Sequence, residues 1–177
     1  MAKRIRLLGK YSQPLFTTFG MMQSKFSPWL LTAALLALLA LTSGCAVEGC
    51  TNPFSDNYNP EATEDDGSCV LAREKFLAQY NVNEACPSGN FTYTINIVAS
   101  TTADNAVIIN NLGGSNAPVN ATVDGNSITI PNQNITSQGL AISLNGSGAL
   151  NGNLLIINYT FNLAGGGESC SMNCTKQ

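Results

Sequence analysis

Hydrophobic and polar residues alternate along most of the chain after Tyr80. In the segment 91–97, apolar Phe91, Tyr93, Ile95 and Ile97 alternate with polar Thr92, Thr94 and Asn96. An alternation of this kind is typical of a β-strand with one face buried and one face in water. It recurs in the segments 80–86, 91–100, 105–111, 117–125, 126–132, 139–146, 153–164 and 168–176. The pattern therefore predicts an all-β domain.

Short runs that favour turns separate these segments. They lie at residues 87–89, 103–105, 113–115, 124–126, 145–146, 151–152 and 165–167. Connections this short make neighbouring strands antiparallel. We expect an eight-stranded antiparallel up-and-down barrel, because a barrel buries one face of the sheet and leaves no free edge. A β-sandwich is the alternative.

A different periodicity precedes the strands. In the segment 71–81, Leu71, Phe76, Leu77 and Tyr80 fall on roughly one face of a helix, which predicts a short helix leading into the first strand. We expect the β-barrel domain to span residues 71–177.

The N-terminal part has the layout of an export signal. Lys25 precedes an apolar run from Trp29 to Leu41, and small residues follow. The run is shorter than the roughly 20 residues that a membrane-spanning helix needs. Residues 1–44 are therefore predicted to form a signal helix that is removed as a signal peptide.

The end of this segment, "LTSGC", resembles the bacterial lipobox, with Ser43 and Gly44 before Cys45. It departs from the usual pattern at Thr42, where Leu is common. The resemblance implies that Cys45 is acylated, becomes the first mature residue and anchors the protein in the bilayer of the bacterial envelope, in the outer membrane. Both leaflets remain open as the location. An ordinary cleaved signal with Cys45 in a disulfide is the alternative.

Two cysteines, Cys50 and Cys69, bracket a segment rich in turn-forming residues. Asn-Pro occurs twice and Asp66-Gly67 once, and neither dipeptide favours a helix or a strand interior. Such a segment cannot bury a core, so we expect a Cys50–Cys69 disulfide, which contributes about 3 kcal/mol in the chain-entropy model. Residues 45–70 are predicted to be a clipped acidic linker, called the clip below.

The same segment resembles one that recurs in exported proteins of Bacteroidetes-type bacteria. The matching blocks are Cys50-Thr51-Asn52-Pro53, Asn57-Tyr58-Asn59-Pro60 and Asp65-Asp66-Gly67-Ser68-Cys69. Asn52 stands where the recurring form has an acid. The resemblance implies an exported lipoprotein of this lineage and indicates no particular activity.

The clip is also rich in oxygen ligands, which hard cations such as Ca²⁺ prefer. The candidate ligands are Asp56, Asn57, Asn59, Glu61, Asp65 and Asp66. Their spacing does not match an EF-hand loop. A calcium loop and a solvated acidic spacer are therefore the two interpretations.

The remaining cysteines bear on the closure of the barrel. In a closed meander the first and last strands pair, and Cys86 ends the first where Cys170 begins the last. We expect Cys86 to form a disulfide with Cys170 or, as the alternative, with Cys174. If Cys45 is acylated, one thiol is left over, and we expect it to be a buried Cys174.

The strand region also resembles the lipocalin-like domain of short Bacteroidetes lipoproteins. The matching stretches are "FLAQYNVNEAC", "GNSITIPNQNI", "GSGALNGNLLIINYT" and "SCSMNCTKQ". The resemblance implies the fold over most of residues 72–177. It implies no activity.

Composition excludes several classes of function. The sequence has no histidine, so a catalytic arrangement that depends on a histidine base or ligand is impossible. After Cys45 there are three basic and eleven acidic residues, a formal charge of −8, which argues against nucleic acid as a partner. We expect a protein that is not an enzyme.

Two functions of different classes remain. The first is a binding module for a small apolar ligand or an envelope partner, with Phe91, Tyr93, Tyr159 and Phe161 lining a pocket inside the barrel. The second is a structural or surface-display protein that presents a polar face for glycan or protein contact. Its predicted residues are Thr92, Thr94, Asn96, Asn120, Thr122 and Thr129.

Overall fold

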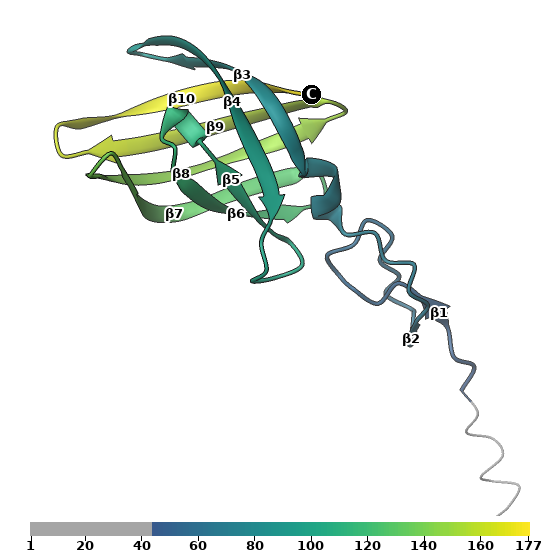
Figure 1. The fold of residues 1–177 in the computed structure, drawn as a ribbon. Coiled ribbons are helices and arrows are strands. Elements are labelled where there is room, and N and C mark those ends of the chain that lie inside the picture. The colour runs from purple at the N-terminus through teal and green to yellow at the C-terminus, as the bar shows by residue number, and fades with distance from the viewer. Residues whose placement is uncertain (1–43) are drawn as a thin grey trace, which may run out of the picture. The chain divides into compact units, whose positions relative to one another are not determined.

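The computed structural model describes residues 44–177, of which Ala46–Gln177 form one compact unit (Figure 1). Eight antiparallel strands close into a barrel in the order β10-β3-β4-β5-β6-β7-β8-β9. Strands that are consecutive in the chain are neighbours in the sheet, and the remaining pair, β10 with β3, closes the barrel. This confirms the predicted up-and-down, lipocalin-like barrel. The strands are β3 (Ala78–Cys86), β4 (Gly89–Ala99), β5 (Ala106–Asn110), β6 (Pro118–Asp124), β7 (Ser127–Ser137), β8 (Leu140–Asn151), β9 (Leu154–Leu163) and β10 (Gly166–Lys176).

The seam of the barrel is the pairing of the first and last barrel strands. β10 pairs with β9 on one side and with β3 on the other, from Ser171 opposite Ala85 to Lys176 opposite Tyr80. The alternative of a β-sandwich is therefore wrong, because no edge strand is left in the sheet of β3–β10.

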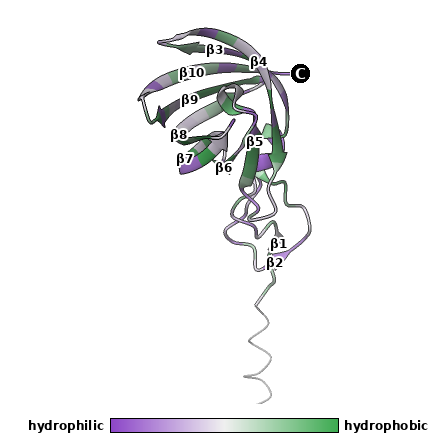
Figure 2. Ribbon diagram, turned by 60° about the vertical axis from the view of Figure 1, so that its left-hand side comes forward, coloured by the Kyte–Doolittle hydropathy of each residue, from purple (hydrophilic) through white to green (hydrophobic). Residues whose placement is uncertain are grey.

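Alternation places the apolar residues inside the barrel, and the ribbon coloured by hydropathy shows apolar and polar bands in turn along the strands (Figure 2). Along β6, for example, Val119, Ala121 and Val123 are buried while Asn120 and Thr122 are exposed. The same rule holds for Leu155 and Ile157 in β9. Burial of these residues is the main stabilising contribution to the barrel.

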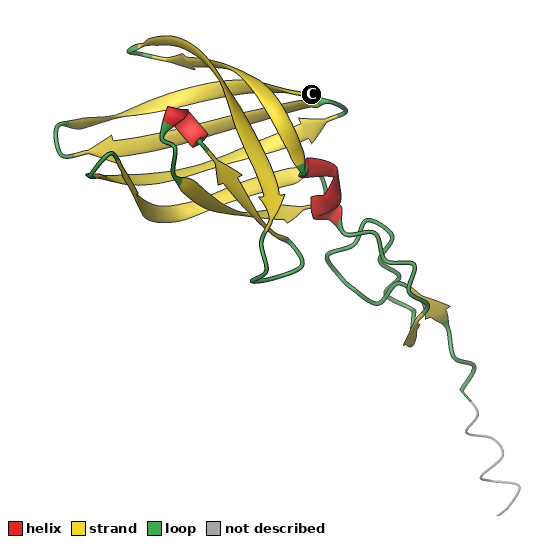
Figure 3. Cartoon of the chain, in the orientation of Figure 1, coloured by secondary structure: helices red, strands yellow, loops and turns green. Residues whose placement is uncertain are grey.

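The short helix before the first barrel strand is smaller than the sequence predicts. It is a 3-10 helix, η2, from Ala72 to Phe76 (Figure 3). Ala72 and Phe76 are buried in the barrel core, but Tyr80, predicted to share a helical face with Phe76, lies in β3. The Tyr80 hydroxyl donates a hydrogen bond to the Phe76 carbonyl at 2.9 Å. The strand alternation that starts at Ala78 therefore prevails over the helical one.

One predicted turn is wrong. Asn145-Gly146 lies inside β8, and β7 and β8 are instead joined at Gln138-Gly139, where both residues have positive φ angles of 51° and 81°. Gly146 is needed because a neighbouring strand approaches closely. A Cβ atom there would lie 2.6 Å from the Cβ of Tyr159.

β7 extends beyond its predicted end at residue 132. The register between β7 and β8 shifts between Ile130 and Gln133, on either side of Pro131. The Gln133 side chain continues the contact to β6, since it accepts a hydrogen bond from the Asn120 N–H at 3.0 Å and donates one to the Asn120 carbonyl at 2.7 Å. Because the register shift interrupts the alternation of apolar and polar residues, the sequence pattern does not show that the strand continues.

The clip folds around its disulfide. Two short parallel strands, β1 (Glu48–Gly49) and β2 (Glu64–Asp65), lie beside the Cys50–Cys69 disulfide, which is confirmed. The clip contacts the barrel domain through the ion pair of Asp56 with Lys75 at 2.7 Å. It therefore lies against the barrel rather than forming a separate unit, although the domain boundary expected at residue 71 stays a prediction.

The predicted signal helix, residues 1–44, lies outside the described residues apart from Gly44. Within the described part of the chain, no helix is long and apolar enough to cross a membrane.

Candidate functional site: the mouth cavity

The two ends of the barrel differ. The loops that follow β4, β6 and β8 lie at the end where η2 and the clip are attached, because the strands run up and down in turn. The buried side chain of Phe76 fills this end. The loops that follow β3, β5, β7 and β9 surround the other end, called the mouth.

A cavity of about 470 Å³ opens at the mouth. It is lined by all four aromatic residues predicted to bind a ligand, namely Phe91, Tyr93, Tyr159 and Phe161. Phe91 is 47% exposed at the rim, while Tyr159 is only 6% exposed. The rings of Tyr159 and Phe161 are stacked with their centroids 6.1 Å apart. The volume is within the range of small-molecule pockets.

The cavity also contains a carboxylate that the sequence analysis missed. Glu84 lines the cavity and is only 4% exposed. The Tyr159 hydroxyl donates a hydrogen bond to its Oε1 at 2.5 Å. Glu84 is in phase with Tyr80, Val82 and Cys86, so the alternation of β3 could have identified it as an inward acid.

Both inner tyrosines are held in their neutral form. Burial, then the nearby charge of Glu84, raises the pKa of the Tyr93 hydroxyl well above its ordinary value. Burial, then the hydrogen bond to Glu84, raises the pKa of Tyr159 in the same way. These hydroxyls therefore act as hydrogen-bond donors beside the carboxylate.

The loop between β5 and β6 reaches the same tyrosines. It contains a second 3-10 helix, η3 (Leu112–Gly114), which is the small helix drawn in front of the strands at the upper left of Figure 3. The Gly113 N–H donates to the Tyr93 hydroxyl at 3.0 Å, and that hydroxyl donates to Met172 Sδ at 3.0 Å. Gly113 has a φ of 61°, and a Cβ there would lie 2.5 Å from the Tyr159 hydroxyl oxygen. Only glycine fits this position.

A second hollow of about 270 Å³ adjoins the loop. It shares Tyr159, Phe161, Gly113 and Gly114 with the mouth cavity. Its remaining lining is mostly apolar and includes Leu112, Ile135, Leu140, Ile142, Leu144 and Leu163. The two hollows together offer one compartment with an acid, Glu84, and one without an acid.

Five of the six predicted calcium ligands of the clip are engaged in local contacts. Asp56 pairs with Lys75. Asn57 donates to the Ser68 carbonyl at 2.7 Å and accepts from the Val70 N–H at 2.9 Å, and Asn59 accepts from the Glu61 N–H at 3.0 Å.

Of the three remaining acids, Asp65 and Asp66 behave similarly. Asp65 and Asp66 accept hydrogen bonds from the N–H groups of Gly67 and Ser68, and hydrogen bonding to Ser68 lowers the pKa of Asp66. Within residues 44–177, no three Asp, Glu or Cys ligand atoms of the clip lie within 4.8 Å of one another. The calcium site stays a prediction.

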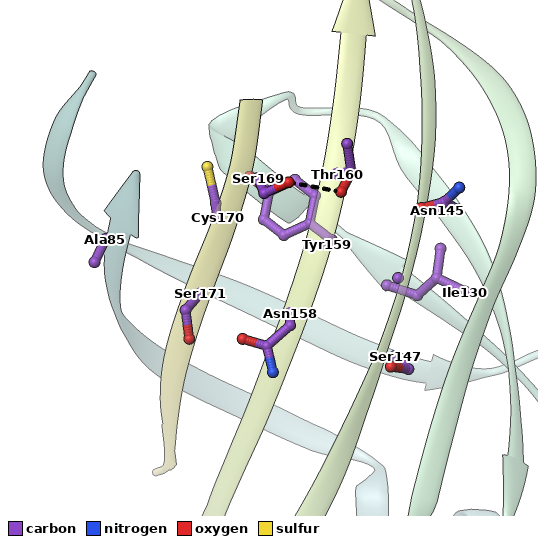
Figure 4. Close-up of a pocket in the computed structure, with 11 residues that line it drawn as sticks. Ala85, Ile130, Asn145, Ser147, Asn158, Tyr159, Thr160, Ser169, Cys170 and Ser171 are labelled. Atoms are coloured by element: carbon purple, nitrogen blue, oxygen red, sulfur yellow. Dashed lines mark hydrogen bonds between the residues drawn. The ribbon is translucent and has the colours of Figure 1, made fainter. Parts of the chain in front are cut away.

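The outer surface carries a separate polar hollow of about 580 Å³ on β8, β9 and β10 (Figure 4). Thr160 and Ser169 share a hydrogen bond of 2.9 Å there, and Asn145, Ser147, Asn158 and Ser171 also line it.

The polar array predicted from the sequence lies elsewhere. All six of its residues are exposed on β4, β6 and β7. However, β5 lies between β4 and β6, and its partly exposed Ile108 interrupts the array. The hollow on β8–β10 is not among the sites predicted from the sequence.

The cysteines of the barrel follow the prediction. Cys86 and Cys170 form a disulfide at the mouth end of the seam, with their Cα atoms 4.4 Å apart. Cys174 is free and buried, and Cys45 is free and exposed. Acylation of Cys45 stays a prediction.

Comparison with known proteins found no matching family model, no similar curated protein and no similar solved structure.

Proposed function

We propose that the protein is an exported, lipid-anchored barrel of the bacterial envelope that binds a small, largely apolar ligand in its mouth cavity. One observation carries the proposal: four aromatic side chains from two distant strands, β4 and β9, converge on a single cavity at the open end of a closed barrel. A barrel of eight strands is wide enough to hold one small ligand.

The surroundings of the cavity support a binding role. Phe161 is only partly buried and Phe91 is 47% exposed, although both are large apolar residues in phase with the core. Aromatic surface left open at a concave site is typical of ligand pockets. A barrel that served only as a scaffold would gain stability by filling this space.

The anchor is supported by the sequence before the barrel. The apolar run from Trp29 to Leu41 and the "SGC" that ends at Cys45 have the pattern of a lipoprotein signal. The clip attaches at the filled end of the barrel, so the mouth lies at the end away from Cys45 in the chain path. An anchored protein of this design keeps its mouth free for a ligand, and we place it in the outer membrane.

The role is proposed to be non-enzymatic. The cavity contains one buried carboxyl, Glu84, hydrogen-bonded to a tyrosine with a raised pKa, and the sequence has no histidine. This set lacks the nucleophile and base pair that covalent catalysis needs.

Native mass spectrometry of the full chain, purified from its own host in mild detergent, tests the binding role. We expect a co-purifying small molecule. Replacing Phe91 with Ala removes part of the cavity wall and lowers its occupancy. Leu154→Ala is the matched control, since Leu154 is 39% exposed on the outer face of β9, and it retains the ligand. A chain that stays bare when offered a panel of lipids and metabolites contradicts the proposal.

A second function is favoured by the polar hollow on β8–β10. Short hydroxyl and amide side chains such as Ser147, Asn158 and Thr160 match the hydrogen-bonding groups of a glycan. A glycan array probed with the full chain distinguishes this role, because Asn158→Ala abolishes glycan binding while Phe91→Ala leaves it unchanged.

A further inference from the structure

Glu84 is a buried acid without a basic partner in the described part of the chain. Its side chain accepts one hydrogen bond from Tyr159. The described basic residues are Arg73, Lys75 and Lys176, and all of them are engaged near the filled end of the barrel. Arg73 donates to the carbonyls of Ser100 and Ala103.

The other two basic residues also have partners elsewhere in the fold. Lys75 pairs with Asp56 at 2.7 Å, and Lys176 donates to the Lys75 carbonyl at 2.9 Å. No cation of residues 44–177 therefore forms a salt bridge with Glu84. Burying a carboxylate without a positive partner is unfavourable unless something else compensates its charge.

A metal ion does not supply the missing charge. Glu84, Cys86 and Cys170 have ligand atoms within 4.8 Å of one another. However, the two sulfur atoms are joined in a disulfide, so neither is available as a thiolate ligand. One carboxylate alone does not make a metal site.

The groups around Glu84 are those that recognise an organic cation. Phe91 lies directly opposite Glu84 in the β3–β4 ladder, and Tyr93, Tyr159 and Phe161 line the same cavity. The face of an aromatic ring attracts an ammonium ion, more strongly where water is excluded. Glu168 adds a second acid at the rim, where its Oε2 accepts a hydrogen bond from the Ser88 hydroxyl at 2.8 Å.

The adjoining hollow indicates the chemistry of the rest of the ligand. It also borders the Gly113-Gly114 loop, and six Leu and Ile side chains are part of its lining. It shares the rings of Tyr159 and Phe161 with the mouth cavity. A ligand that spans both compartments has a charged group at one end and an apolar body at the other.

We propose that the ligand is an organic amine, whose ammonium group pairs with Glu84 among the aromatic rings and whose apolar body occupies the hollow beside Leu144. The inference rests on the proposed binding function and specifies its ligand class. The ammonium donates hydrogen bonds to the carboxylate, and the folded barrel holds that carboxylate in place before the ligand arrives, so little reorganisation opposes binding.

Calorimetric titration of the full chain in a non-ionic detergent, with hexylamine and with hexanol as probes, tests the inference. The two probes have the same apolar body and differ in the charged group. We expect the amine to bind at least about tenfold more tightly than the alcohol, since a charge-assisted hydrogen bond and cation–π contacts are added. Glu84→Gln removes this preference, so that the two probes bind the variant with equal affinity.

The control is Asp124→Asn, which changes the net charge equally but lies in an exposed position at the filled end; it keeps the preference. Equal affinity of the wild type for both probes, or a preference that survives Glu84→Gln, overturns the inference and leaves the binding function intact. No binding of either probe overturns both. If Glu84→Gln does not fold, Phe91→Leu tests the inference instead. We expect loss of the aromatic ring to weaken amine binding more than alcohol binding. An equal loss of affinity for both probes overturns the inference.

Discussion

Single residues inside the barrel show how burial controls ionisation. Burial, followed by the charge of Glu84, raises the pKa of the Cys174 thiol from 9.0 to about 12. Burial, followed by Cys174, raises the pKa of Tyr80 from 10.0 to about 12. Both groups are neutral in the folded protein at any physiological pH. The free thiol is therefore a core residue rather than a reactive one.

These shifts predict a loss of stability in alkali. Above about pH 9 the unfolded chain releases the Cys174 proton, while the folded chain keeps it until about pH 12. The free energy of unfolding therefore falls as pH rises, by up to about 1.4 kcal/mol per pH unit for each such group. Urea unfolding between about pH 8 and 11 measures the slope.

Cys174→Ala makes this slope shallower, because one of the groups is removed. Thr175→Ala is the control, since its exposed side chain does not ionise, and it keeps the wild-type slope. Identical slopes for all three proteins would show that Cys174 titrates alike in the folded and unfolded states.

At the scale of elements, the sequence predicts strands well and their ends less well. Alternation over β6 is reliable because an apolar side chain on the wrong face would lie in water. Asn145-Gly146 is misread as a turn because local composition does not show that Tyr159 of the next strand lies against Gly146. A close approach between strands depends on the tertiary structure.

Gly146 therefore gives a prediction for β8. A methyl group there meets the Tyr159 Cβ at 2.6 Å and the Asn158 carbonyl oxygen at 2.7 Å. We expect Gly146→Ala to lower the free energy of unfolding by about 1–3 kcal/mol, as overpacking does. Chemical denaturation measures it.

The matched control is Gly165→Ala, because no atom lies within 4 Å of a Cβ built at Gly165. We expect it to leave stability within about 0.5 kcal/mol of the wild type. Equal effects of the two substitutions would mean that β8 and β9 are further apart than the structure has them.

Alternation along the strands also predicts part of the candidate site. Phe91, Tyr93, Tyr159 and Phe161 follow the apolar phase of their strands, so their convergence could be predicted from the sequence. Glu84 follows the inward phase of β3 too, so the alternation could have placed this acid inside the barrel. The cavity itself depends on where the Leu112–Gly114 loop lies, and no sequence pattern specifies that position.

At the scale of the whole molecule, the two ends of the barrel have opposite character. The filled end holds Phe76 and the three described basic residues, and the clip is attached there. The mouth holds Glu84 and Glu168 with an open cavity. Under the proposed function, attachment at the filled end leaves the mouth accessible to a ligand.

The two disulfides serve these two ends differently, which gives a last prediction. Cys86–Cys170 closes a separation of 84 residues across the seam, whereas Cys50–Cys69 closes 19 residues outside the barrel core, whose buried cluster begins at Ala72. Replacing Cys86 and Cys170 with Ala should lower the barrel's free energy of unfolding by about 4 kcal/mol, because a long loop is released in the unfolded chain.

The paired variant at Cys50 and Cys69 is the matched comparison. It releases only the clip, so the barrel transition should stay near that of the wild type while the clip becomes sensitive to proteases. Urea unfolding followed by tyrosine fluorescence reports on the barrel, since Tyr80, Tyr93 and Tyr159 lie within it. If the clip variant destabilises the barrel as much as the seam variant, the clip is part of the barrel's cooperative unit, and the prediction is wrong.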